Sequence, residues 1–413
     1  MQTIDEQEIK GIKQIEKQKF KLAGAKLKGY EYTKTYYKMQ DGKIVVTDKG
    51  DDSALTMINI TKTNAEPNKE KRAFIASEGY IGADKSYNED GTKKKSVSHK
   101  KGFGISFLMD YIGNAPENID EFHVMFLSDK EKSENQAELF AQAIKDIGSR
   151  DDIKSVNMWC HSKSGLLSLR AFQKLKAEQN MDTDKVLKKV SAVLTSMPAR
   201  GIEGTDRNAI IEKINENGLI KIMPFSGYIK TGILSFYDKF LYKPCPAQVD
   251  IKKPKENTSE NALVEYKQKG MLGKIWNKIQ GNDAFQKRVN MEKQVDYDAG
   301  YLDRVTNEAN MESINDVKYK TLPIDLTTEA AFSSLLREGQ VMPLVLSLKK
   351  AVTSKDQKGD GIIDYESQGI GEKSFEERLK IDTSKVIKAS HDVATTERGG
   401  MEVIAKELDD EER

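Results

Sequence analysis

Apolar residues follow two alternating patterns across the middle of the chain. Short apolar runs at residues 123–128, 155–160 and 190–196 are typical of strands, and the last is the pattern of a strand buried on both faces. The segments between them repeat apolar residues every three or four positions, as an amphipathic helix does. Strands that alternate with helices predict the α/β class, with a mostly parallel sheet flanked by helices.

The region before residue 120 predicts shorter elements. Residues 43–47 and 54–61 have the composition of strands and predict an antiparallel hairpin at the edge of the sheet. The apolar run 73–77 predicts a further strand, which ends in a glycine turn. Residues 1–27 are rich in Lys, Glu and Gln and predict a charged, solvated helix ahead of the core.

The alternation of strands and helices stops near Arg200. Residues 203–338 mix helical stretches with polar linkers, and a strand pattern returns at 341–348. We therefore expect a core in two parts, residues 28–202 and 339–413. The segment between them is expected to be a large, mainly helical insertion that forms a cap or lid over the site.

Composition narrows the class of protein. Lys and Arg together number 66 and Asp and Glu 65, and this balance disfavours a nucleic-acid-binding protein. The N-terminal segment has no apolar stretch typical of a secretory signal, and no run approaches the length of a membrane-spanning helix. Cys160 and Cys245 are too few for a disulfide framework. We expect a soluble, cytoplasmic protein, and the composition leaves its oligomeric state open.

The segment Cys160-His161-Ser162-Lys163-Ser164-Gly165 lies where a predicted strand runs directly into a predicted helix. A serine on such a turn is held at the rim of the sheet, and its strained backbone accepts only small residues two positions before and after it. Cys160 and Ser164 are small. The segment resembles the nucleophile elbow Gly-x-Ser-x-Gly of the α/β-hydrolase family, with both glycines replaced. A serine here is also typical of an ordinary helix N-cap.

The resemblance covers about residues 70–200 and 340–400, and it implies a catalytic triad in the order Ser, acid, His. Serine is a poor nucleophile at neutral pH and needs an adjacent base. The only histidine after Ser162 is His391, in a loop that precedes a predicted C-terminal helix. We therefore expect Ser162 as the nucleophile and His391 as its base.

The acid of the triad is suggested by a second local resemblance. Many lipases and esterases carry their catalytic Asp in an Asp-Gly-apolar-apolar segment, and Asp360-Gly361-Ile362-Ile363 is similar to it. The resemblance selects Asp360, with Asp364 second and Asp356 third. Its role would be to orient the imidazole and to stabilise the imidazolium.

An oxyanion hole needs two backbone N–H groups, one of them from the residue after the nucleophile. That residue is Lys163. The resemblance places the second donor in the loop after an early strand, and this implies the amide of Tyr80, with Ile81 in reserve. The family often has His-Gly before this donor, whereas this chain has Glu78-Gly79.

Residues 356–367 also allow a different interpretation. Asp356, Asp360 and Asp364 fall at positions one, five and nine of an EF-hand calcium loop. Lys358 stands at position three, however, and Ser367 replaces the bidentate Glu at position twelve. Calcium binding is therefore the weaker interpretation of this segment.

The resemblance as a whole implies a serine hydrolase that cleaves a carboxylic ester, small-molecule or lipid-like, through an acyl-enzyme intermediate. This chemistry requires no cofactor and no metal. Three alternatives stay open. The first is an acyltransferase, thioesterase or amidase on the same fold, and the second is a catalytically silent binding protein that retains the hydrolase scaffold. The third is a calcium-responsive interaction protein built on residues 356–367.

Overall fold

The computed structural model describes a sheet, its covering helices and several connecting segments. Described are residues 2–3, 30–48, 54–62, 70–77, 79, 119–128, 131–201, 300–327, 330–331, 347, 358–360, 363, 365–389 and 403–408. Expectations for the rest of the chain, including most of the cap expected at residues 203–338, lie outside the described residues.

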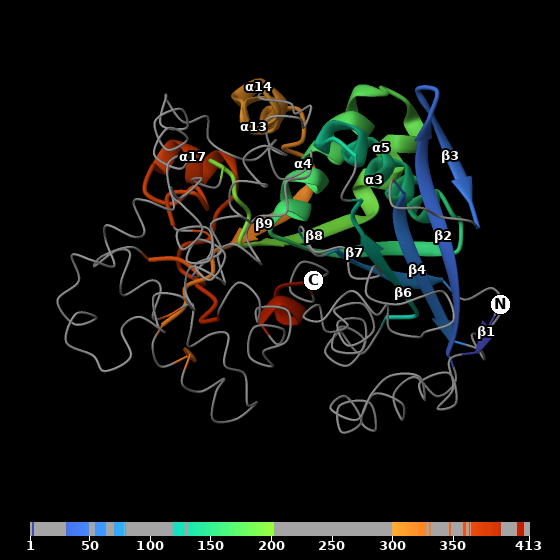
Figure 1. Cartoon of the computed structure of the whole chain (residues 1–413), viewed down its shortest axis with the longest axis horizontal. Coiled ribbons are helices and arrows are strands. Elements are labelled where there is room, and N and C mark those ends of the chain that lie inside the picture. The colour runs from blue at the N-terminus through green and yellow to red at the C-terminus, as the bar shows by residue number, and fades with distance from the viewer. Residues whose placement is uncertain are drawn as a thin grey trace, which may run out of the picture.

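The described residues form one nine-stranded sheet, with the strand order β1-β2-β4-β6-β5-β7-β8-β9 and with β3 paired to β2 (Figure 1). Strands β6, β5, β7, β8 and β9 run parallel, whereas β1 to β4 pair antiparallel and join the parallel part through β4 and β6. The strands are β1 (Gln2–Thr3), β2 (Tyr30–Gln40), β3 (Lys43–Thr47), β4 (Leu55–Lys62), β5 (Lys71–Ser77), β6 (Glu121–Phe126), β7 (Ile153–His161), β8 (Val190–Thr195) and β9 (Lys318–Leu322).

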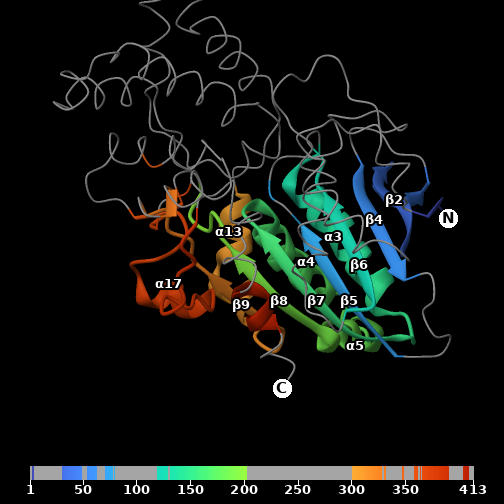
Figure 2. The ribbon, with the colours of Figure 1, turned by 90° about the horizontal axis from the view of Figure 1, so that it is seen from below.

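Helices cover both faces of this sheet (Figures 1 and 2). Helices α3, α4 and α5 lie on one face, and the helical residues 403–408 lie on the other, so the predicted α/β class and C-terminal helix are confirmed. None of the helices within the described ranges has both the length and the apolar composition needed to cross a membrane. The helices are α3 (Ser133–Gly148), α4 (Lys163–Ala177), α5 (Met181–Lys189), α13 (Tyr301–Thr306), α14 (Glu308–Glu312) and α17 (Lys373–Arg378).

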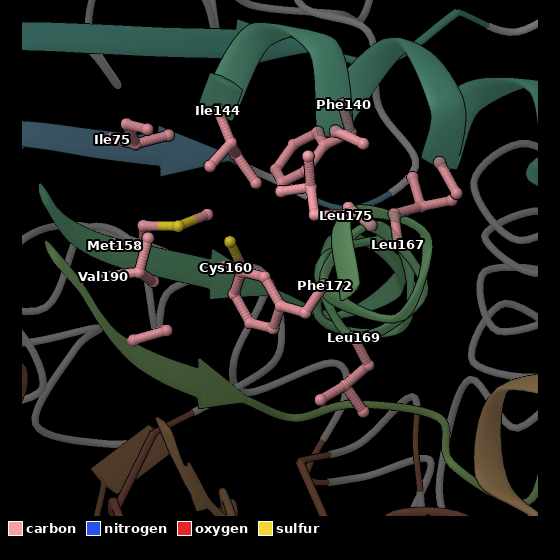
Figure 3. Packing of buried hydrophobic residues seen from close by; sticks show 14 of the residues in the cluster. Ile75, Phe140, Ile144, Met158, Cys160, Leu167, Leu169, Phe172, Leu175 and Val190 are labelled. Atoms are coloured by element: carbon pink, nitrogen blue, oxygen red, sulfur yellow. The ribbon is translucent and has the colours of Figure 1, made fainter. Parts of the chain in front are cut away.

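The central strand β7 contributes to the core on both of its faces. Met158 and Cys160 belong to the core cluster on the side of α3 and α4, where Cys160 lies beside the ring of Phe172 (Figure 3). Trp159, between them in sequence, points to the opposite face and joins the cluster beneath the C-terminal helix. Side chains of a strand alternate between faces, so a strand covered on both sides must be apolar throughout. The predicted strand 190–196 has this pattern and is confirmed as β8. The predicted strand 155–160 is confirmed as β7, with Asn157 as a buried polar exception.

The antiparallel part of the sheet differs from the prediction. Residues 43–47 and 54–61 do form strands, but they do not pair with each other. Strand β3 pairs with β2 across a turn at Asp41 and Gly42, both of which have positive φ (51° and 72°), as a two-residue type I′ hairpin requires. Strand β4 pairs with β2 on its other edge. Within the predicted N-terminal helix 1–27, the described residues 2–3 form a strand instead.

The segment expected to be a cap contributes to the core. Strand β9 lies within residues 203–338 and pairs in parallel with β8. It escaped the sequence analysis because Lys318 and Lys320 make its pattern polar. Lys320 is nevertheless accommodated, since its Nζ lies 2.5 Å from an Oε of Glu407 in the C-terminal helix. Of the strand expected at 341–348, only residue 347 is described, and it is helical.

A cluster of charges fixes the amino ends of the parallel strands. The carboxylate of Glu121, which is 2% exposed, accepts two hydrogen bonds from Arg150, at 2.6 and 2.8 Å, and one from Lys71 at 3.0 Å. Burial by itself raises the pKa of Glu121, but the contacts with His123, Arg150 and Lys71 outweigh it and hold that pKa well below its ordinary value. The cluster thus stabilises the fold while Glu121 is ionised.

We predict that Glu121→Gln lowers the free energy of unfolding at pH 7 by about 1–3 kcal/mol, because charge-assisted hydrogen bonds are lost while Arg150 and Lys71 keep partial contact with water. A carboxyl whose pKa is lower in the folded state stabilises above its unfolded pKa, near 4, and loses this contribution as the pH falls below it. The difference in the free energy of unfolding between the wild type and Glu121→Gln should therefore shrink from about pH 4 downward. Urea unfolding across this range measures it.

The control is Glu138→Gln, since Glu138 is 41% exposed and pairs with Lys174 on the helix surface. It should change the free energy of unfolding by about 0.5 kcal/mol or less. Equal losses in the two variants would contradict the role of the Glu121 cluster.

Candidate active site

Ser162 has a backbone conformation that a residue with a side chain rarely adopts. It lies between β7 and α4 with φ 57° and ψ −128°, and its N–H donates to the carbonyl of Thr195 at 2.8 Å. Ser162 stands at the N-cap position of α4, but its side chain makes no capping hydrogen bond. An ordinary N-cap has a negative φ and uses its side chain on the helix amides. The geometry is instead that of a strained strand-to-helix turn.

The positions two residues away from Ser162 are as small and buried as this turn requires. Cys160 and Ser164 are both 0% exposed. The Oγ of Ser164 lies 2.7 Å from the carbonyl oxygen of Ser77 and 2.8 Å from that of His161, so it fixes the end of β5 to the turn. Burial raises the pKa of the Cys160 thiol to about 12, which removes it as a competing nucleophile.

Gly79 packs directly against Ser162. A Cβ added to Gly79 would lie 2.6 Å from Ser162 Cβ, 2.9 Å from its Oγ and 3.1 Å from the amide nitrogen of Lys163. Any other residue at position 79 would therefore displace the serine. Tyr80, the predicted second oxyanion donor, and Ile81 lie outside the described residues, but the nitrogen of Tyr80 is bonded to the carbonyl carbon of Gly79. The amide of Lys163 and the Gly79 backbone thus converge on Ser162.

Asp360 is fully buried at the carboxyl end of β8. Its Oδ2 accepts a hydrogen bond from Ser196 Oγ, and its Oδ1 accepts one from the amide of Ile363 at 2.7 Å. Ser196 directly follows Thr195, whose carbonyl oxygen holds the Ser162 amide. The structure therefore brings Asp360 to the strand adjacent to the one that carries Ser162.

A second carboxylate in this region was missed by the sequence analysis. Asp325, 7% exposed, follows β9 closely and accepts a hydrogen bond from the amide of Gly359 at 2.9 Å. Its other oxygen lies 3.8 Å from Lys388 Nζ. An Asp that closely follows a strand is a signal for such a residue. The signal was not recognised in the sequence, because the lysines of β9 make its pattern unlike that of a buried strand.

His391 lies outside the described residues, but the chain on both sides of it is placed. Ile387 forms a bridge to Ile324 beyond the end of β9, and Ala389 is fully buried in the same core cluster as Ile404 of the C-terminal helix. The described residues before and after His391 are thus anchored beside β9. The carboxyl ends of β9, β8 and β7 lie at the same edge of the sheet, because these strands are parallel.

The two described histidines of the chain have other surroundings. His123 lies on β6 with its Nδ1 2.8 Å from Asn59 Oδ1, beside the Glu121 cluster at the amino end of the parallel strands. His161 is 3% exposed, and its Nδ1 lies 3.0 Å from Thr195 Oγ1, which also accepts a hydrogen bond from Trp159 Nε1 at 2.8 Å.

The calcium interpretation of residues 356–367 is not tested, since Asp356 and Asp364 lie outside the described residues. Among the residues whose placement is described, no three His, Cys, Asp or Glu side chains gather as a metal site would require. Asp360, the member of the loop that is described, uses both carboxylate oxygens on Ser196 and Ile363.

The chain has an α/β-hydrolase-like fold. This fold is defined by the crossed strand order around β5 and β6, the parallel strands, the covering helices and the strained serine after the central strand.

No family model matches the sequence, and neither does any curated protein. Solved structures of similar fold include two ester hydrolases and an α/β-hydrolase. The esterase Est22 is 9% identical, with 94% of this chain and 81% of that chain covered and a TM-score of 0.41. The mature lipase BlEst2 of Bacillus licheniformis is 12% identical (83% and 94% covered, TM-score 0.36). The peroxisomal α/β-hydrolase Lpx1 of Saccharomyces cerevisiae is 11% identical (92% and 88% covered, TM-score 0.40).

Replacement of Gly79 by Ala is predicted to disable the site without unfolding the protein. The new methyl group would displace both the Ser162 side chain and the Lys163 amide, and loss of an oxyanion donor, the role expected for that amide, costs about 10²–10³ in rate. The rate of hydrolysis of p-nitrophenyl acetate measures the loss, and circular dichroism confirms the fold.

Gly165→Ala is the matched control, because the three atoms nearest to the added Cβ belong to the side chain of Met197, at 3.2–3.3 Å, and not to Ser162 or Lys163. It should reduce the rate far less. A Gly79→Ala variant as active as Gly165→Ala would show that the contact with Ser162 is unimportant.

Proposed function

We propose that the protein is a serine hydrolase that cleaves a carboxylic ester through an acyl-enzyme intermediate on Ser162. The observation that carries the proposal is the positive φ of Ser162, with Gly79 and the Lys163 amide packed against its side chain. A non-glycine residue in such a conformation costs about 1–3 kcal/mol, and strain of this kind is concentrated at functional sites.

The reaction follows from the groups assigned to the site. Ser162 Oγ attacks the ester carbonyl carbon while His391 takes its proton, and the amides of Lys163 and Tyr80 stabilise the resulting oxyanion. The bond to the leaving oxygen then breaks, and the alcohol departs with the proton from His391. Water attacks the acyl group by the reverse sequence, which releases the carboxylic acid and restores the serine. Asp360 orients His391 and stabilises its charged form.

The geometry supports His391 and Asp360 in these roles. Ala389 is two residues before His391, which limits the distance between their Cα atoms to about 7 Å. Ile387, which bridges Ile324 beyond β9, and the buried Ala389 fix the chain that leads to His391 on the side of the sheet where Asp360 is held, and this supports His391 as the base. The two histidines that are described, His123 and His161, have Asn59 and Thr195 as hydrogen-bond partners.

The same acyl-enzyme would serve an acyltransferase or a thioesterase, which differ only in the acceptor or in the bond that is cleaved. A silent binding protein is disfavoured by the retained strain at Ser162, since nothing in binding alone requires it. We place the substrate among small-molecule or lipid-like esters, with the segment 203–299 as the cap that shapes the acyl pocket.

The proposal is tested with p-nitrophenyl esters from acetate to laurate. Ser162→Ala and His391→Ala should each lower kcat by about 10⁴-fold or more, and Asp360→Asn should lower it by up to about 10⁴-fold, because the serine is not activated without its base and the base is misoriented without its acid. Ser149→Ala, which alters a hydroxyl bound to the Lys145 carbonyl on the surface, should leave kcat unchanged.

Added methanol or a thiol acceptor distinguishes a hydrolase from a transferase, since only a transferase diverts most of the acyl group from water. A folded wild-type protein that turns over none of the esters, or that is as active without Ser162 as with it, would refute the proposal.

A further inference from the structure

Ser196 occupies an unfavourable backbone position without an evident need of the fold. It directly follows β8, has φ 48° and is fully buried. Its N–H donates to the carbonyl of Leu322 at 3.3 Å, which turns the chain away from the sheet. Glycine would adopt this left-handed conformation with no steric penalty. What a serine adds there is its hydroxyl group.

That hydroxyl group donates to Asp360 Oδ2, and the amide of Ile363 donates to Oδ1. Each carboxylate oxygen therefore has a donor from the protein. Both hydrogen bonds favour the ionised carboxylate, and rotation of the carboxylate about the Cβ–Cγ bond would break both of them.

The same strand end also holds the nucleophile. The carbonyl oxygen of Thr195 accepts the Ser162 amide at 2.8 Å, and the next residue holds Asp360. The relative position of serine and acid is thus set by two consecutive residues, Thr195 at the end of β8 and Ser196 directly after it. We infer that Ser196 is a positioning residue, which holds the Asp360 carboxylate in the orientation that its role toward His391 requires; this inference rests on the proposed serine-hydrolase function.

The neighbouring carboxylate has a different role. Asp325 Oδ1 accepts a hydrogen bond from the amide of Gly359, the residue before Asp360, and Asp325 Oδ2 lies 3.8 Å from Lys388 Nζ. It therefore fixes the backbone that carries Asp360 and has a cation of its own. Ser196 acts on the Asp360 carboxylate itself, so its effect is expected in the chemical step.

Ser196→Gly separates this role from a structural one. Glycine accepts the positive φ, so the variant should fold as well as the wild type while the hydroxyl is lost. We expect kcat for ester hydrolysis to fall about ten- to a hundredfold, the effect of one hydrogen bond to a charged group, with KM unchanged because Ser196 does not touch the substrate. Ser196→Ala is the second variant, with the same expected kcat.

The matched control is Ser191→Ala, which removes another buried hydroxyl from the same strand, at its amino end. It should leave kcat and KM as in the wild type. Urea unfolding of each variant reports any loss of stability separately from the loss of rate.

A double-mutant cycle with Asp360→Asn identifies the partner. Acylation by an activated ester, followed as a rate constant, stays measurable in slow variants. If Ser196 works through Asp360, adding Ser196→Gly to Asp360→Asn should not lower the acylation rate constant further. If the two residues act independently, the fold-losses of the two single variants should multiply in the double variant.

The outcomes separate this inference from the function on which it rests. Wild-type kcat in Ser196→Gly, or a multiplicative loss in the double variant, overturns the role of Ser196 and leaves hydrolysis by Ser162 standing. Absence of ester turnover in the wild type, or turnover that survives Ser162→Ala, overturns the proposed function and this inference together.

Discussion

The turn at Ser162 requires that three strand ends be arranged around one strained residue. The positive φ at this position directs the side chain out of the sheet, and it is sustained by the hydrogen bond from Ser162 to Thr195 on β8. On the other side, Ser164 fixes the end of β5, and Gly79 leaves the space that the serine occupies. A strain of about 1–3 kcal/mol is small beside the burial of a parallel core, so the sheet can maintain it. The site is therefore a property of the sheet edge, and it depends on the registers of β5, β7 and β8.

The two ends of the parallel strands carry different chemistry. At the amino ends, Glu121 is neutralised by Arg150 and Lys71, and this ion-pair cluster contributes to stability. At the carboxyl ends, Ser162 follows β7 and Asp360 is held at the end of the adjacent β8, both by hydrogen bonds with backbone and hydroxyl groups. Parallel strands bring all their carboxyl ends to one edge, so residues distant in sequence meet there. Stability and the candidate chemistry are thus separated along the strands.

The parallel core could be predicted because strands buried on both faces leave continuous apolar runs in the sequence. The outer strand β9 could not, since Lys318 and Lys320 give it a polar pattern that only the partner in the C-terminal helix explains. Within the site, Ser162 and Asp360 carry local motifs and were selected from sequence alone, although their catalytic roles remain predictions, as do those of His391 and Tyr80. Ser196 has no local motif. Its partner is 164 positions away, and its significance arises only from a left-handed turn and a long-range hydrogen bond.

The central claim is that Ser162 is an activated nucleophile, and covalent labelling tests it most directly. The folded protein is treated with a fluorophosphonate, its intact mass is measured, and the modified peptide is sequenced by mass spectrometry. The account predicts one adduct per chain, on the Ser162 hydroxyl, and its loss in Ser162→Ala. An adduct on a different residue, or a folded protein that stays unlabelled by the smallest fluorophosphonates, would contradict it.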